Sequence, residues 1–274
     1  MASIDQLQLA QALFGAVLEA GRIEMAHFHA GVAVETKADR TPVTVADRDA
    51  EAVILAALAR VAPGVPVAAE EAVAANGMPV IGDRFFLVDP LDGTREFIAG
   101  RPEFTVNIGL IDRGRPVFGL VYAPAVSRLF VTLAADNAVE IAVGPDSGAS
   151  SLETLSSRRL RTREPDETAL TAIASRSHMS KDTETFLARY RISERKTAGS
   201  SLKFCLVANG EADLYPRFGP TCEWDTAAGD AILLAAGGIV TGLDGAPLPY
   251  GKADRRLLNP PYVAWGRGPL APVR

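Results

Sequence analysis

The stretch from Phe85 to Thr94 constrains the fold and the chemistry of this chain more than any other. It reads Phe-Phe-Leu-Val-Asp-Pro-Leu-Asp-Gly-Thr. The first four residues form a short continuous apolar run, which indicates a buried strand. Pro90 has no N–H to donate to a neighbouring strand, so we expect the strand to stop there. Gly93 then favours a tight turn.

The end of this strand offers oxygen ligands for a hard divalent cation. Asp89 and Asp92 stand three residues apart, with the Leu91 carbonyl between them. Magnesium is bound by carboxylate, carbonyl and water oxygens, so a turn that gathers these groups can hold it. The backbone N–H groups after Gly93 would be free for an anion. The same residues also suit an ordinary acidic turn, and only further acidic loops elsewhere in the chain favour the metal site.

Composition restricts the class of protein. The 274 residues carry a formal net charge of −5, and no block of Lys or Arg stands out, which argues against an extended surface for nucleic acid. Cys205 and Cys222 have no metal-like spacing, which favours free thiols in a reducing cytosol. We expect no signal peptide and no transmembrane segment, and therefore a cytoplasmic protein.

Two helices are expected before this strand. Apolar residues at helical spacing predict the first from residue 3 to about 28, with Ser3 and Gln6 as a capping box. Thr44 and Asp47 indicate the start of the second, which ends before Pro63. Asp47 would interact favourably with the dipole of that helix, and this structural role is compatible with a functional one.

Glu70 and Glu71 follow a short apolar strand predicted over residues 65–69. Adjacent glutamates usually face solvent. These two end a strand just before the one that carries Asp89, so they could reach the same edge of a sheet.

The rest of the chain divides into two patterns. Residues 105–143 predict four short strands joined as antiparallel hairpins. Beyond the polar residues 144–151 strands and helices alternate, which suggests a compact α/β half. We therefore expect an N-terminal α+β subdomain over residues 1–148 and a C-terminal α/β subdomain over residues 149–274. The second half is expected to contain strands over 170–174 and 212–216 and helices over 182–190, 202–208 and 225–236, the last capped by Asp225.

The acidic motifs together resemble those of a known family. The stretch 89–94 and the pair Trp224-Asp225 resemble the paired motifs of the inositol monophosphatase superfamily. Glu70-Glu71 stands at the expected distance upstream, and residues 37–47 resemble the mobile metal loop and helix start of that superfamily. The stretches that resemble its bacterial 3'(2'),5'-bisphosphate nucleotidase branch are residues 41–44, 103–108, 199–208 and 214–221. The resemblance continues to Leu258-Asn259-Pro260.

The resemblance implies a mixed α+β and α/β fold, a layered α-β-α-β-α sandwich whose two subdomains meet at the metal site. It also implies a magnesium-dependent, lithium-sensitive phosphomonoesterase. The implied reaction is hydrolysis of adenosine 3',5'-bisphosphate to AMP and phosphate by direct attack of water. Such an enzyme would clear a by-product of sulfate assimilation.

Carried over residue by residue, the resemblance implies two magnesium ions. Glu70, Asp89 and the Leu91 carbonyl would hold one, and Asp89, Asp92 and Asp225 the other. Glu71 would stand behind these ligands, or help to hold a third, weakly bound ion together with residues 39–41. The catalytic residues implied are Glu70, through its metal, and Thr94, which Asp47 would orient so that it polarises the attacking water.

The implied substrate contacts extend beyond the metal site. Arg and Lys suit phosphate on physical grounds, although Lys203 and Arg217 could also be ordinary surface charges. The expected contacts are Gly93, Thr94 and Arg95 at the scissile phosphate, His178 near the adenosine, and Ser200, Lys203, Arg217 and Asp225.

Alternatives with the same metal ligands stay open at this point. An inositol monophosphatase or a fructose-1,6-bisphosphatase would share every ligand, and the sulfated nucleotide 3'-phosphoadenosine 5'-phosphosulfate is a further candidate substrate. A metal-dependent nucleotide-binding module without catalysis is an alternative of another class, although it has no need for a water-activating pair. The oligomeric state, a homodimer included, stays open, as does peripheral attachment to the cytoplasmic face of the inner membrane.

Overall fold

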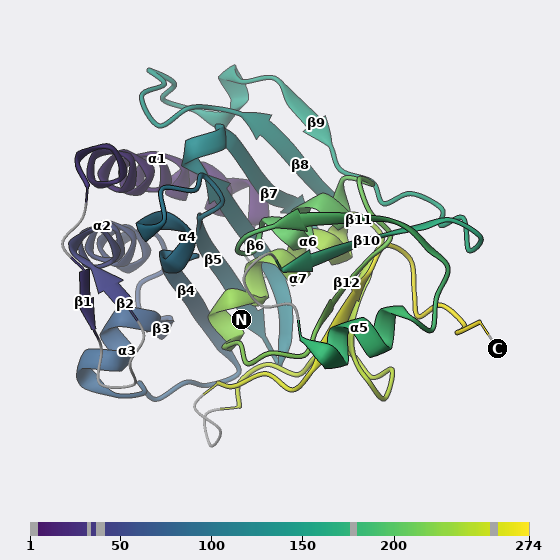
Figure 1. The fold of residues 1–274 in the computed structure, drawn as a ribbon. Coiled ribbons are helices and arrows are strands. Elements are labelled where there is room, and N and C mark those ends of the chain that lie inside the picture. The colour runs from purple at the N-terminus through teal and green to yellow at the C-terminus, as the bar shows by residue number, and fades with distance from the viewer. Residues whose placement is uncertain (1–4, 32–33, 37–41, 176–179, 253–256, 274) are drawn as a thin grey trace.

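The chain folds into five layers of alternating helices and sheets (Figure 1). The structure, a computed structural model, describes residues 5–31, 34–36, 42–175, 180–252 and 257–273. Helices α1 (Gln6–Ala30) and α2 (Val45–Val61) cover one face of a seven-stranded sheet, and α6 (Leu202–Ala208) and α7 (Ala227–Ala235) cover the other. A five-stranded sheet and α5 (Lys181–Leu187) complete the stack. The expected α-β-α-β-α sandwich is confirmed.

The larger sheet has the strand order β3-β4-β5-β6-β7-β8-β9. The first pair, β3 and β4, is parallel, and the remaining neighbours are antiparallel. The hairpins expected over residues 105–143 are confirmed, and β9 was not predicted. The division of the chain after residue 148 stays a prediction. The strands are β3 (Val67–Ala69), β4 (Arg84–Asp92), β5 (Thr105–Asp112), β6 (Arg115–Ala123), β7 (Arg128–Ala134), β8 (Asn137–Ala142) and β9 (Ser157–Arg159).

The smaller sheet has the order β11-β10-β12-β14-β13. Strand β10 is parallel to both β11 and β12, whereas β14 is antiparallel to β12 and β13. Its strands are β10 (Leu170–Ser175), β11 (Ile192–Ala198), β12 (Leu214–Arg217), β13 (Ile239–Gly242) and β14 (Tyr262–Trp265). The short elements are β1 (Val34–Thr36), β2 (Pro42–Thr44), α3 (Glu70–Asn76), α4 (Thr94–Ile98), η1 (Pro124–Val126), η2 (Leu152–Thr154) and η3 (Glu223–Asp225).

The apolar run that opens β4 is explained by burial of both faces of the sheet. Phe86 and Val88 lie in the core beneath α1 and α2, whereas Phe85 and Leu87 lie in the core that contains α6 and α7. The expectation that Pro90 ends the strand is wrong. The ladder with β5 continues to the end of β4, and the proline is accommodated by a shift of register.

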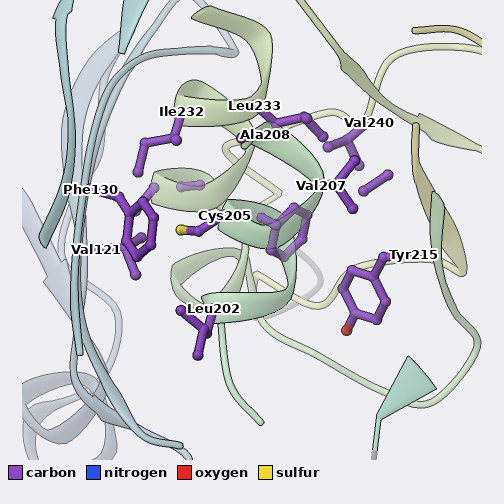
Figure 2. Packing of buried hydrophobic residues seen from close by; sticks show 14 of the residues in the cluster. Val121, Phe130, Leu202, Cys205, Val207, Ala208, Tyr215, Ile232, Leu233 and Val240 are labelled. Atoms are coloured by element: carbon purple, nitrogen blue, oxygen red, sulfur yellow. The ribbon is translucent and has the colours of Figure 1, made fainter. Parts of the chain in front are cut away.

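Helices α6 and α7 lie between the two sheets. Figure 2 shows Cys205 pointing from α6 toward Val121 and Phe130 of the larger sheet, with Tyr215 and Val240 on the other side of the helices. A side chain at Gly119 of β6 would approach the Ala228 carbonyl oxygen to 2.1 Å. Glycine is therefore what allows α7 to lie directly on the sheet.

Two predicted helix caps are wrong. The cap of α1 is Asp5, whose Oδ1 accepts the Gln8 N–H at 3.1 Å, and Ser3 lies outside the described residues. The cap of α7 is Thr226. Asp225 instead ends η3 and accepts the Cys222 N–H at 2.8 Å. Among the described residues, no helix combines the length and the apolarity that crossing a bilayer requires.

A buried carboxyl on α7 is expected to make stability depend on pH. Burial raises the pKa of Asp230 from about 3.8 to about 7. A hydrogen bond from the Tyr250 hydroxyl, at 2.9 Å, lowers this pKa but does not offset the effect of burial. Between these two values the folded state binds more protons than the unfolded state, so the free energy of unfolding falls as pH rises. The total loss is about 4 kcal/mol, since each unit of pKa corresponds to about 1.4 kcal/mol.

Urea unfolding from pH 4 to pH 7 checks this, with Asp230→Asn expected to show a smaller decline in the free energy of unfolding than the wild type. The exposed Asp244→Asn is the control and should keep the wild-type slope. Equal slopes for wild type and Asp230→Asn would contradict the assignment.

Candidate metal and phosphate site

The end of β4 opens into a cavity of about 390 Å³. Its walls come from the start of α3 and α4, the loop before α6, the end of β12 and η3, so segments distant in the sequence meet there. The charged residues that line it are Glu70, Asp89, Asp92, Arg95, Glu96, Lys203, Arg217 and Asp225. Carboxylates and cations therefore line the same cavity.

The parallel pairing of β3 and β4 explains why Glu70 and Asp89 are neighbours. Ala69 pairs with Val88, so the next residue of each strand emerges at the same edge of the sheet. The start of α3 is fixed by Glu51 of α2, whose carboxylate accepts the backbone N–H groups of residues 71 and 72, both at 2.8 Å. Glu51 was not predicted from the sequence. Its position one residue after Ala50 on the apolar side of the second helix was the available signal.

Three carboxylates form a cluster suited to a cation. One oxygen each of Glu70, Asp89 and Asp225 lies within 4.8 Å of the others. Burial and the negative charges of the neighbouring carboxylates raise the pKa of Asp89 and that of Asp225. An all-oxygen donor set with this excess of negative charge fits a hard divalent cation such as magnesium or calcium. The donor chemistry therefore agrees with a metal site.

Asp92 lies in the same cavity but outside this set of three. Its Oδ2 accepts the Ser201 N–H at 2.6 Å, the Ser201 hydroxyl at 2.9 Å and the Asn107 amide at 3.2 Å. The Ser201 hydroxyl also lies 2.6 Å from the carbonyl oxygen of Asp225. Ser201 thus connects the carboxylate of Asp92 to the backbone of Asp225, and these two residues come from opposite halves of the chain. Neither Ser201 nor Asn107 was predicted as a site residue, although each lies in a stretch that carries the family resemblance.

The turn after β4 brings Thr94 to Asp47. Gly93 has φ +96°, in the left-handed region that favours glycine. The Thr94 hydroxyl lies 3.4 Å from Asp47 Oδ1 and 3.2 Å from the Leu91 carbonyl oxygen. Asp47 Oδ2 accepts the Thr44 N–H at 2.8 Å and the Thr44 hydroxyl at 2.6 Å. The predicted cap of the second helix is therefore confirmed. The other carboxylate oxygen of Asp47, Oδ1, faces the Thr94 hydroxyl.

The two cations are buried, so the idea that they are ordinary surface charges is wrong. Lys203 is 5% exposed and Arg217 is 9% exposed. Lys203 Nζ donates to the Ser200 carbonyl oxygen at 2.5 Å, and this serine holds a left-handed conformation with φ 46°. Arg217 donates to the carbonyl oxygens of Gly219 and Pro220, both at 3.2 Å. Each cation thus also fixes a loop of the cavity wall.

The other residues predicted for the site are partly at or near the cavity and partly outside the described residues. Arg95 is exposed at the rim of the cavity, and Glu71 is 9% exposed. His178 and the loop of residues 39–41 lie outside the described residues.

Fold and cavity together define a two-sheet α/β protein with a cluster of carboxylates that could hold a metal ion. Residues 5–267 match the model of the inositol monophosphatase family. The chain is 42% identical over 229 residues to a 3'(2'),5'-bisphosphate nucleotidase CysQ of Escherichia coli (strain K12), covering 84% of this chain and 87% of that protein. This protein therefore belongs to the inositol monophosphatase family.

Solved structures agree with this assignment. The crystal structure of CysQ from Bacteroides thetaiotaomicron, a bacterial member of the family, superimposes with a TM-score of 0.78 at 38% identity, covering 94% of this chain and 97% of that one. An inositol monophosphatase from Zymomonas mobilis gives a TM-score of 0.72 at 25% identity, covering 93% and 91% of the two chains.

Proposed function

We propose that this protein is a magnesium-dependent 3'(2'),5'-bisphosphate nucleotidase that hydrolyses adenosine 3',5'-bisphosphate to AMP and phosphate. The observation that carries the proposal is the combination, in one cavity, of a carboxylate cluster with the buried cations Lys203 and Arg217. A substrate with two phosphates can present one to the metal centre and the other to the cations. The similarity to relatives named as bisphosphate nucleotidases supports the same substrate class.

The metal ligands in this proposal come from three segments of the chain. Glu70, Asp89 and the Leu91 carbonyl would hold one magnesium ion, and Asp89, Asp92 and Asp225 a second. A third ion would depend on Glu71 and residues 39–41. Bound magnesium would neutralise charge on the phosphoryl group and lower the pKa of water.

The chain's own groups would orient the water and the phosphate. The two hydrogen bonds from Thr44 hold the Asp47 carboxylate, whose second oxygen faces the Thr94 hydroxyl. When the hydroxyl proton points to Asp47, Thr94 Oγ1 offers a lone pair to the attacking water and polarises it. The backbone N–H groups of residues 93–95 would bind the scissile phosphate.

The expected cytoplasmic location of the protein is compatible with the proposed reaction. A cytoplasmic enzyme that acts on a small nucleotide fits a role beside sulfate assimilation, in which adenosine 3',5'-bisphosphate accumulates. We expect inhibition by lithium. A homodimer and attachment to the inner membrane remain predictions, which sedimentation and cell fractionation would test.

Replacing the buried cations is expected to discriminate between nucleotide and sugar phosphates. Arg217→Gln and Lys203→Met should lower kcat/KM for adenosine 3',5'-bisphosphate by about 10²-fold, because a charge-assisted hydrogen bond is worth about 1.5–3 kcal/mol. Turnover of inositol 1-phosphate, measured with the same variants, should fall much less. Ser200→Ala should show the same preference, with a smaller loss.

Arg163→Gln provides a matched control for the loss of an arginine. Arg163 is paired with Asp213 at 2.8 and 2.6 Å, away from the cavity. Its loss should affect the two substrates equally. An equal loss of both activities in Arg217→Gln would assign that residue to loop structure and reject a role in recognition.

A further inference from the structure

The stretch Leu258-Asn259-Pro260 belongs to a segment that packs against the turn carrying Asp225. We call residues 249–252 and 257–260 the clamp, and residues 221–226 the acidic turn. The backbone of the clamp pairs with the acidic turn at both ends. The Glu223 N–H donates to the Leu257 carbonyl oxygen at 2.8 Å, and the Asn259 N–H donates to the Thr221 carbonyl oxygen at 2.9 Å.

The Asn259 side chain holds both sides of the acidic turn. Its Nδ2 donates to the Cys222 carbonyl oxygen at 2.8 Å. The same nitrogen lies 3.1 Å from the Thr226 hydroxyl and 3.2 Å from the Thr221 hydroxyl. One amide group therefore contacts residues that precede and follow Asp225.

An ion pair between Lys252 and a buried carboxylate fixes the other end of the clamp. Glu223 is fully buried, and its carboxylate accepts the N–H groups of Gly251 and Lys252 at 2.7 and 2.8 Å. The Lys252 ammonium lies 2.7 Å from the same carboxylate. A buried charge with this many partners resists movement, because displacing it would leave it uncompensated.

Cys222 links the clamp to the metal centre. Its carbonyl oxygen accepts from Asn259, and its N–H donates to Asp225 Oδ2 at 2.8 Å. The residue that orients the Asp225 carboxylate is thus itself held by Asn259. This matters because Asp225 stands within 4.8 Å of two other carboxylates, and like charges at that distance repel each other.

We propose that Asn259 is a positioning residue for the metal centre: through Cys222 it holds the Asp225 carboxylate against its acidic neighbours before a cation binds. The contribution of Asn259 is preorganisation, which raises affinity by removing the cost of ordering the site. Partners that orient metal ligands typically contribute about 10–100-fold to metal affinity. The inference rests on the proposed function only in assigning Asp225 to the metal.

Metal affinity of Asn259→Ala tests the proposal without relying on catalysis. Binding of Mn²⁺ alone is measured from the loss of the free Mn²⁺ signal in electron paramagnetic resonance. We expect affinity to fall by about tenfold or more. In the phosphatase assay the variant should need correspondingly more magnesium, with kcat at saturating metal close to that of the wild type.

Asn209→Ala is the matched control for loss of an asparagine. Asn209 also bridges a loop, with its amide 2.6 Å from Glu211 Oε1, and its loss should leave Mn²⁺ affinity unchanged. In the background of Asp225→Asn, Asn259→Ala should cause little further loss, because the two residues act through one carboxylate.

Thermal unfolding separates a positioning role from a purely structural one. Mn²⁺ should raise the Tm of the wild type more than that of Asn259→Ala. Unchanged Mn²⁺ affinity in a less stable Asn259→Ala would overturn the proposal. A wild type that binds Mn²⁺ but releases no phosphate from the nucleotide would reject the proposed function and leave the positioning role standing.

Discussion

Asp89→Asn is expected to lose phosphatase activity by about 10³-fold or more while the protein remains folded. The substitution removes one of the three carboxylates of the cluster, and metal ions contribute several kcal/mol to such reactions. The fold should persist because Asp89 Oδ1 accepts the Leu91 N–H at 3.0 Å, and an asparagine oxygen can do the same.

The same variant is expected to be more stable than the wild type when no metal is bound. Burial and neighbouring charges raise the pKa of Asp89, which means that its ionised form is disfavoured in the fold. Removing that charge relieves the repulsion. Calorimetric unfolding in a chelator should therefore show a higher Tm, and phosphate release in magnesium should show the loss of activity.

Asp244→Asn is the control for this experiment. Asp244 Oδ1 makes the same local hydrogen bond, accepting the Ala246 N–H at 3.0 Å, but on an exposed turn. It should alter neither activity nor the effect of metal on Tm. Activity of Asp89→Asn within tenfold of the wild type would be incompatible with a ligand role for Asp89.

Thr94→Val and Asp47→Asn are each expected to lower kcat by about 10²–10⁴-fold, the range typical of a general acid–base group. Valine keeps the shape of threonine and removes the hydroxyl that faces Asp47. Asparagine can still accept the hydrogen bonds from Thr44. If Thr94 and Asp47 act as one unit, the double variant should be little slower than the worse single variant.

Thr94→Ser is the control, because it keeps the hydroxyl. It should retain activity within about tenfold of the wild type, the size of loss that a change of about 1.4 kcal/mol produces. The measurement is kcat with saturating magnesium. If the loss of kcat in the double variant equals the product of the two single losses, the two residues act independently.

Local sequence patterns predicted those helices and strands whose formation depends on residues that are close together in the chain. The apolar run before Asp89, the cap formed by Thr44 and Asp47, and the hairpins of residues 105–143 all depend on neighbours in the chain, and all are confirmed. The strands β11, β13 and β14 were missed. Strand β11 is mostly exposed, and β13 and β14 are short, so none of the three shows a clear alternation of apolar and polar residues. These strands form because they pair with strands that are distant in the sequence.

Local sequence patterns also predicted only part of the candidate site. Its carboxylates were expected from the motifs they share with a known family, because composition and spacing alone also suit acidic turns and caps. The burial of Lys203 and Arg217 was not predictable, since it arises where α6 and β12 meet the cavity. Ser201 and Asn107 act through hydrogen bonds across 94 residues of sequence, a relation that no local pattern contains.

The most direct test of the proposed function is phosphate release by the wild type from three substrates in magnesium. The substrates are adenosine 3',5'-bisphosphate, inositol 1-phosphate and fructose 1,6-bisphosphate, each with and without lithium. We expect a strong preference for the nucleotide, AMP as its product, and inhibition by lithium. Preference for inositol or fructose phosphate, or binding of the nucleotide without release of phosphate, would contradict the proposed function.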